Sequence, residues 1–225
     1  MTPWVLLDSA PVPGNGGELR LYQRGDEFSI RIVGRGELMN SRAHGSEDAL
    51  AALTCARLEN TVNPRLLIGG LGMGFTVGAA LPHLSEQARV VVAELVPAVV
   101  AWNAGPLAQL AGHPLEDPRV SVREGDVARS LKTEKNTYDA ILLDVDNGPE
   151  GLTRRENDWL YSTQGLSAAH EALRPRGVLA VWSAGPAQDF QERLRKVGFE
   201  VDEVRVHAHG SKGPRHVIWF ARREF

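Results

Sequence analysis

From Pro64 onward the sequence alternates between short apolar runs and helical stretches, and this pattern restricts the fold more than any other feature. The apolar runs read "RLLIGG", "RVVVAEL", "RVSVREGD", "YDAILLDVD" and "GVLAVWSA". Nearly continuous apolar strands are typical of sheets buried on both faces, and strands that alternate with helices form right-handed crossovers. The pattern therefore predicts an α/β fold with a doubly wound, mostly parallel sheet.

The two ends of the chain follow other patterns. Residues 18–40 alternate apolar and polar side chains around glycine turns, which predicts a small N-terminal antiparallel β meander. The segment "SEDALAALTCARLEN" follows as a predicted helix with Ser46 as its N-cap. At the other end, "FEVDEVRVHAH" and "HVIWFARR" predict a terminal antiparallel hairpin. We therefore expect the meander to occupy residues 1–45 and the sheet domain residues 46–225.

Composition argues against several classes of function. The chain has 225 residues, of which 43% are hydrophobic, and a formal charge of −3, so it lacks the positive surplus that a nucleic-acid backbone demands. The N-terminus lacks the pattern of a signal peptide, and no segment approaches a membrane span. We expect a cytoplasmic protein that binds neither nucleic acid nor membrane. Cys55, the only cysteine, is expected to be a buried small hydrophobe.

The segment "IGGLGMGF" occupies the first turn from strand to helix, where an open α/β sheet brings its backbone against a ligand. Glycines permit backbone dihedrals that other residues avoid and leave N–H and C=O groups bare. Glu94 ends the second strand 20 residues after Gly74 (94 − 74), where a carboxylate can accept both ribose hydroxyls of a nucleoside. The candidate cofactor-binding residues are Gly69, Gly70, Gly72, Gly74, Glu94, Asp126 and Val127.

Two readings of Asp126 stay open. This residue closes the third strand, where its carboxylate can accept from an adenine amino group. It also precedes "VARSLK", where an aspartate is a common helix N-cap.

NAD and S-adenosylmethionine both fit a glycine loop with an acid on the next strand. A dinucleotide fold normally uses GxGxxG, whereas Phe75 and Thr76 directly follow Gly74 here. The chain also offers only about five parallel strands before its terminal hairpin. S-adenosylmethionine is therefore favoured, and a dehydrogenase is the least favoured function.

Five motifs together resemble those of the spermidine synthase family, in order and spacing, from about residue 18 to residue 184. They read "RLLIGGLGMGFT", "VVVAELVPAVVAWN", "DPRVSVREGDV", "YDAILLDVDNGPEG" and "LYSTQGL". This family is a branch of the class I methyltransferase fold that transfers aminopropyl groups from decarboxylated S-adenosylmethionine to polyamines. The resemblance implies a Rossmann-like methyltransferase sheet whose last strand inserts antiparallel.

The chain departs from the family pattern around the acceptor. Gly72 stands where the family has an aspartate, and "RAHGSE" retains His44 of a Tyr-His-Glu motif without the tyrosine. After the fourth strand Asp144 matches the first family aspartate, and Asp146 roughly matches the second. We take Asp144, Asp146 and His44 as the candidate catalytic residues.

The missing acid at Gly72 removes a contact that would favour a cationic aminopropyl tail, whereas bare backbone N–H groups suit the carboxylate of S-adenosylmethionine itself. We therefore expect methyl transfer from S-adenosylmethionine to a small amine or similar nucleophile. The first alternative is an aminopropyltransferase that uses decarboxylated S-adenosylmethionine. The second is a nucleoside-binding module without catalysis.

The expected partners are a small-molecule acceptor, such as an amine, and a second copy of the chain in a homodimer. His207, His209 and His216 have a spacing that can bind a metal, but no cysteine or carboxylate clearly completes the set. We therefore expect no metal.

Overall fold

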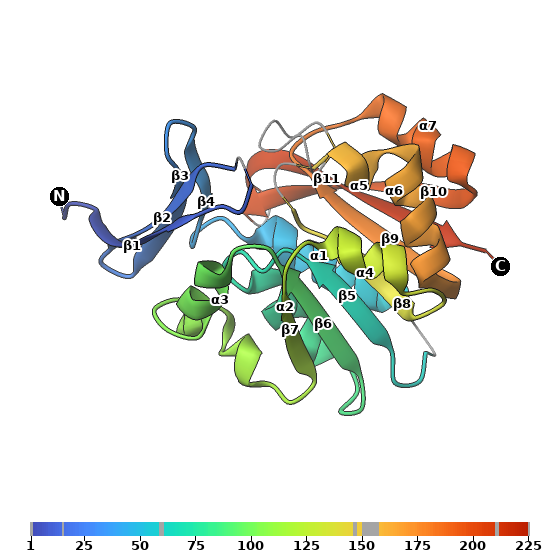
Figure 1. The fold of residues 1–225 in the computed structure, drawn as a ribbon, viewed down its shortest axis with the longest axis horizontal. Coiled ribbons are helices and arrows are strands. Elements are labelled where there is room, and N and C mark those ends of the chain that lie inside the picture. The colour runs from blue at the N-terminus through green and yellow to red at the C-terminus, as the bar shows by residue number, and fades with distance from the viewer. Residues whose placement is uncertain are drawn as a thin grey trace.

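A computed structural model describes residues 2–14, 16–58, 61–145, 148–149, 158–209 and 212–224 of the chain. The N-terminal segment forms a four-stranded antiparallel sheet in the order β1-β2-β3-β4 (Figure 1). Its strands are β1 (Val5–Pro11), β2 (Glu18–Arg24), β3 (Glu27–Ile32) and β4 (Gly36–Asn40). The predicted meander is present as β2–β4, and β1 adds an edge strand that the sequence pattern did not predict.

The second sheet has seven strands in the order β10-β11-β9-β8-β5-β6-β7. Its strands are β5 (Arg65–Gly69), β6 (Arg89–Glu94), β7 (Val120–Glu124), β8 (Tyr138–Leu143), β9 (Leu173–Ser183), β10 (Phe199–His209) and β11 (Lys212–Arg223). Strands β5–β9 are parallel, and β11 lies antiparallel between β9 and β10. The α/β fold class with a terminal hairpin is confirmed. Since β5 has β6 on one side and β8 on the other, the strand order reverses at β5, where ligands bind in such sheets.

Helices cover both faces of this sheet (Figure 1). One face packs against α1 (Gly45–Ala56), α2 (Phe75–Ala80) and α3 (Pro97–Asn103). The other packs against α4 (Val127–Thr133), α5 (Asp158–Tyr161), α6 (Thr163–Ala172) and α7 (Gln188–Val197). Three short 3₁₀ turns span Leu81–His83, Ala108–Ala111 and Pro114–Glu116. Along β5, Leu66 and Ile68 enter the first core and Leu67 enters the second, which is the alternation expected of a strand buried on both faces.

The start of α1 corrects one prediction. The N-cap position is held by His44 and carries no capping hydrogen bond from its side chain, so Ser46 is not the N-cap. Ser46 lies inside the first turn, and its hydroxyl donates to the Glu47 carboxylate at 2.6 Å. Cys55, further along α1, is buried and free, as predicted.

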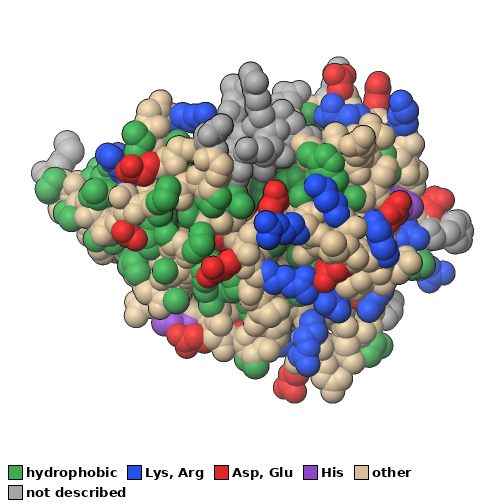
Figure 2. Space-filling model, in the orientation of Figure 1, with side chains coloured by type: hydrophobic (Ala, Val, Ile, Leu, Met, Phe, Trp, Pro, Cys, Tyr) green, Lys and Arg blue, Asp and Glu red, His purple; other side chains and the backbone are tan. Residues whose placement is uncertain are grey.

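The N-terminal sheet packs against the main sheet domain. Leu19, Ile30 and Ile32 belong to the same apolar core as α1 and α2, and Trp102 Nε1 on α3 donates to Asp8 Oδ2 at 2.7 Å. Part of this sheet is exposed: hydrophobic side chains gather on its surface in Figure 2, and Val5 on β1 is 55% exposed. Within the described part of the chain, no helix combines the length and apolar character needed to cross a membrane.

Candidate active site

A cavity of about 360 Å³ lies between the N-terminal sheet and the carboxyl ends of the parallel strands. The N-terminal sheet contributes an apolar wall that includes Ile30, Ile32 and Met39. The volume of the cavity falls within the usual range for small-molecule sites. The carboxylates among its lining residues are Glu37, Glu47, Glu94, Asp126 and Asp144, and the described lining residues include neither a lysine nor an arginine.

The glycine loop after β5 lines this cavity through Gly70 and Gly72. Gly70 has φ +88°, and a Cβ atom there would collide with the carbonyl oxygen of Asp144. Gly72 has φ +53°, and its Cβ would lie 2.8 Å from Met39 Cε. Both positions therefore favour glycine, because a side chain would be strained in this backbone conformation and would meet a neighbour.

The other two predicted glycines are not among the lining residues of the cavity. A Cβ on Gly69 would lie 3.0 Å from Val127 and 3.1 Å from Leu143, so this glycine permits close packing at the end of β5. Gly74 has φ +83° and precedes α2, where a Cβ would lie 2.8 Å from Asn103 Oδ1. Both glycines therefore allow the loop to pack closely against neighbouring side chains outside the cavity.

Glu94 lies at the end of β6, beside the loop, and is 7% exposed. Leu71 N donates to Glu94 Oε2 at 2.8 Å, and Val96 N donates to Oε1 at 2.8 Å. Burial raises the pKa of Glu94, although these backbone hydrogen bonds lower it in part. Each carboxylate oxygen can accept more than one hydrogen bond, so the group can hold the loop and still accept from a ligand.

Asp126 and Val127 line the same cavity near the end of β7. Asp126 Oδ1 accepts from Ala128 N at 2.8 Å and so caps α4. Capping and ligand contact are compatible here, because the carboxylate has a second oxygen. A shallower neighbouring hollow also includes Asp126 and brings Arg129 and Lys132 to this side of the site.

Asp144 follows β8 and lines the cavity beside the glycine loop. Thr76 Oγ1, from the first turn of α2, donates to Asp144 Oδ2 at 2.6 Å, and Asp144 N donates to Gly69 O at 2.9 Å. Burial raises the pKa of Asp144, and the Thr76 hydrogen bond lowers it in part. The functional role of Asp144 stays a prediction, and these two hydrogen bonds fix the position of its side chain and backbone in the cavity.

Glu47 is a pocket residue that the sequence reasoning missed. It lies in the first turn of α1, lines the cavity and is 8% exposed. Burial, followed by the charge of Asp144, raises the pKa of Glu47 to about 7. Acids in the first turn of a helix are common because they interact with the helix dipole, so "SEDAL" is an ordinary helix start. The signal for Glu47 in the sequence is its place at the end of "RAHGSE", the segment compared with the family's Tyr-His-Glu motif.

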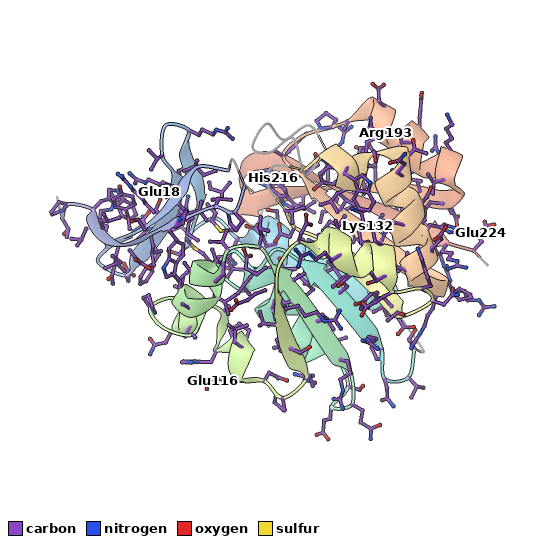
Figure 3. The ribbon with its side chains drawn as sticks, in the orientation of Figure 1. Glu18, Glu116, Lys132, Arg193, His216 and Glu224 are labelled. Atoms are coloured by element: carbon purple, nitrogen blue, oxygen red, sulfur yellow. The ribbon has the colours of Figure 1, made fainter. Side chains whose placement is uncertain are left out.

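His216 reaches the cavity from β11, at the end of the strand nearest the N-terminal sheet (Figure 3). Its Nδ1 lies 2.9 Å from Ser46 Oγ, and its ring meets the edge of Trp182 at 4.7 Å between centroids. Trp182 also lines the cavity, and its Nε1 is buried with no hydrogen-bond partner among the described residues. The terminal hairpin therefore contributes to the site, which the sequence did not predict.

His44 is not among the residues that line this cavity. Its ring stacks on Phe75 with centroids 4.2 Å apart, and its Nδ1 pairs with Asp48 Oδ2 at 2.8 Å. Asp146, the other candidate catalytic residue, lies outside the described residues. In the described ranges, no cluster of three or more histidine, cysteine or acidic side chains is arranged to hold a metal.

Comparisons with known proteins identify similar chains. A polyamine aminopropyltransferase 2 from Pseudomonas aeruginosa is 33% identical over 120 residues, which cover 52% of this chain and 32% of the relative. A polyamine aminopropyltransferase from Oceanobacillus iheyensis is 30% identical over 168 residues, which cover 72% of this chain and 31% of the relative. The chain thus spans about a third of the length of each of these two relatives. No protein-family model matches the chain.

Among solved structures, the spermidine synthase from Thermotoga maritima superposes with a TM-score of 0.73 at 18% identity, covering 97% of this chain and 72% of that chain. This similarity includes the N-terminal sheet, since nearly the whole chain is covered. The strand order, with the last strand antiparallel between β9 and β10, agrees with it. The chain therefore has the spermidine synthase-like form of the class I S-adenosylmethionine-dependent methyltransferase fold, and its sequence is similar to polyamine aminopropyltransferases over part of their length.

Proposed function

We propose that this chain is an aminopropyltransferase that uses decarboxylated S-adenosylmethionine and a small amine. The observation that carries the proposal is the charge of the cavity, where Glu47 and Asp144 are two of five lining carboxylates and no described lining residue is a lysine or arginine. The curated relatives, named polyamine aminopropyltransferases, support the same activity. Both lines of support favour the aminopropyl alternative over the methyl transfer expected from the sequence.

The two nucleosides differ in the charge of their tails. The tail of S-adenosylmethionine carries a carboxylate, whereas the decarboxylated form keeps only an ammonium group. Two unit charges about 4 Å apart interact by about 4 kcal/mol at an effective dielectric constant of about 20. The expectation of methyl transfer considered only the acid missing at Gly72. Glu47 supplies a negative charge to the same cavity from α1, so a carboxylate tail is repelled after all.

The nucleoside would lie along the carboxyl edge of the sheet. In this proposal Glu94 accepts from the ribose hydroxyls while it holds the glycine loop, and Asp126 contacts the adenine. The tail then extends toward Asp144 and Glu47, away from the hollow that contains Arg129 and Lys132. This placement puts the cationic tail against the carboxylates.

The transfer step needs an amine with a free electron pair. At neutral pH the acceptor is mainly an ammonium ion, so it must lose a proton before its nitrogen attacks the carbon next to sulfur. The new N–C bond forms as the C–S bond breaks, and the electron pair of that bond stays on sulfur as a neutral thioether. Asp144, oriented by Thr76, holds the amine, and Glu47, whose pKa of about 7 matches neutral pH, accepts the proton.

The first experiment compares the affinities of the two nucleosides by calorimetry. Wild-type protein should bind decarboxylated S-adenosylmethionine at least about tenfold more tightly than S-adenosylmethionine, and Glu47→Gln should reduce this ratio. Glu116→Gln removes an exposed carboxylate on another part of the surface and should leave the ratio unchanged (Figure 3). Tighter binding of S-adenosylmethionine by the wild type would contradict the charge argument.

The second experiment identifies the product. Incubation with putrescine and each nucleoside, followed by mass spectrometry, should show an aminopropylated amine only with the decarboxylated nucleoside. Methyl transfer remains the second candidate, because Gly72 places no acid in the loop and Met39 covers that position. A methylated amine would establish that candidate instead. Nucleoside binding without turnover on any amine would indicate a non-catalytic module.

A further inference from the structure

Ser46 bridges two titratable groups of the cavity. Its hydroxyl donates to Glu47 Oε2 at 2.6 Å, and His216 Nδ1 lies 2.9 Å from the same oxygen. Ser46 is fully buried, and Glu47 is 8% exposed. His216 comes from β11, 170 residues along the chain, so α1 and the terminal hairpin must pack together for the bridge to form.

The hydroxyl has a single proton, which fixes the direction of the hydrogen bonds in each protonation state. When Glu47 is ionised, Ser46 donates to Glu47, and the proton between Ser46 and His216 must reside on His216 Nδ1. When Glu47 is protonated, its carboxyl group can donate to Ser46 Oγ, and Ser46 then donates to His216 Nδ1. A change in the protonation of Glu47 therefore reverses both hydrogen bonds.

We infer that Glu47, Ser46 and His216 form a proton relay that carries the proton of the acceptor amine out of the cavity. Ser46 and His216 are positioning residues of this relay, since they act through Glu47. The inference rests on the proposed function, in which an ammonium group loses one proton before it attacks. It assigns a role to the terminal hairpin, which the candidate catalytic residues did not include.

The relay conserves protons at every step. The Glu47 carboxylate takes one proton from the ammonium group, which becomes a neutral amine. Because ionised Glu47 holds His216 as the Nδ1–H tautomer, His216 must next exchange this proton with water for one on Nε2, which leaves its number of protons unchanged. Glu47 Oε2 then passes a proton to Ser46 Oγ as the original hydroxyl proton of Ser46 moves to the vacant Nδ1 of His216. The imidazolium formed on His216 releases its Nε2 proton, and the three groups return to their starting charges. No electron transfer or further reactant is needed.

The surroundings set the proton affinities at the two ends of the relay. Asp144 from the end of β8 and Asp48 on α1 act on Glu47, and its pKa is raised to about 7 by burial and then by Asp144. The other lining acids are Glu37, Glu94 and Asp126. Burial lowers the pKa of His216 below its ordinary 6.5. Glu47 thus binds its proton more tightly than His216 does, so the transfer to His216 is uphill and is completed when His216 releases its Nε2 proton.

The first test observes the relay without any turnover. In protein labelled with ¹⁵N-histidine, the nitrogen chemical shifts of neutral His216 should change from the Nε2–H to the Nδ1–H tautomer as Glu47 ionises, with a midpoint near pH 7. In Glu47→Gln and in Ser46→Ala this change should be lost. His170, which packs edge-on against Phe199 and does not line the cavity, is the internal control and should behave alike in all three proteins. One unchanged tautomer of His216 across this pH range in the wild type would overturn the relay.

The second test measures turnover. Ser46→Ala and His216→Asn should lower kcat by roughly 10- to 100-fold near pH 7 with little change in KM for the nucleoside. The difference in kcat between each variant and the wild type should decrease at high pH, where the amine loses its proton to solvent. Added imidazole should partly restore the kcat of a His216→Ala variant. A matched His170→Asn variant should retain wild-type kcat.

The outcomes separate the relay from the proposed function. Wild-type kcat in both Ser46→Ala and His216→Asn at every pH would exclude the relay while leaving aminopropyl transfer intact. A wild-type protein that transfers nothing to any amine would refute the proposed function. The tautomer measurement would still decide whether protons move between Glu47 and His216.

Discussion

Glu47 and Asp144 present two carboxylates to the same cavity, Glu47 from the first turn of α1 and Asp144 from the end of β8. The charge of Asp144 adds to burial in raising the pKa of Glu47 to about 7. Two buried acids of like charge are unfavourable when both are ionised, and a cationic ligand relieves that cost. In the proposed function this cationic ligand is the tail of the nucleoside or the acceptor amine, so its binding should stabilise the folded protein.

Glu47→Gln should make the stability of the protein less dependent on pH. The pKa of Glu47 is about 7 in the folded chain and about 4.5 in the unfolded chain, so the folded state binds more protons between these values. Stability therefore falls as the pH rises from about 4.5 to about 7, and a shift of this size corresponds to roughly 3 kcal/mol. Urea denaturation at several pH values would measure this loss. Glu116→Gln is the control for removing one carboxylate, and a variant at Glu47 that keeps the full pH dependence would refute the assignment.

Asp144→Asn should lower turnover without removing the nucleoside. The substitution keeps the shape of the side chain but removes the charge that holds the amine, so kcat should fall by roughly 10²–10⁴, and this fall should exceed the loss of affinity for the cationic tail of the nucleoside. Thr76→Val provides a companion test, because loss of the hydroxyl that lowers the pKa of Asp144 should move the rising limb of the pH–rate profile to higher pH. If Asp144→Asn abolishes nucleoside binding with no separate effect on turnover, Asp144 belongs to the nucleoside site and does not hold the acceptor amine.

Glu94→Gln should weaken both nucleoside binding and the glycine loop. Loss of charged hydrogen bonds to the ribose should reduce affinity by about 2–4 kcal/mol. The amide can accept from only one of the backbone N–H groups of Leu71 and Val96, so the free energy of unfolding should also fall by about 1–2 kcal/mol. Calorimetry and urea denaturation measure the two effects separately, with Glu124→Gln on the exposed neighbouring strand as the control. Unchanged affinity in a folded variant would exclude Glu94 from the ribose site.

Gly72→Ala and Met39→Ala should be coupled in a double-mutant cycle. A methyl group on Gly72 would lie 2.8 Å from Met39 Cε, so Gly72→Ala should lower the free energy of unfolding. Shortening Met39 removes that contact, so Met39→Ala should recover roughly 1 kcal/mol of this loss of stability. The remaining loss reflects the φ of +53°, which an alanine rarely adopts. Gly74→Ala is the matched control, because its methyl group would meet Asn103 Oδ1. Met39→Ala should therefore not change the loss of stability that Gly74→Ala causes. Strictly additive effects of the first pair would show that Met39 does not cover the loop.

The sequence by itself determined the main sheet and its glycine loop. Buried strands between helical stretches leave few arrangements other than a doubly wound sheet, and the glycines with Glu94 stand at the turn and strand end where that sheet binds ligands. These features are local, because each depends on a run of neighbouring residues. The edge strand β1 was missed for the same reason, since "VLLDSAP" is exposed on both sides for most of its length and shows no alternation.

Only the tertiary structure decided that Glu47 and His216 lie in the same cavity as the acids at the strand ends. Glu47 reads in the sequence as an ordinary acid in a first helical turn, and His216 as a polar residue on a hairpin. They join the site because α1 packs across the sheet against β11, and this packing brings Ser46 within 2.9 Å of a residue 170 positions away. The same packing removes Glu47 from water beside Asp144, which gives it a pKa of about 7. Burial and distant charges set this property, and neither can be read from the residues next to Glu47 in the chain.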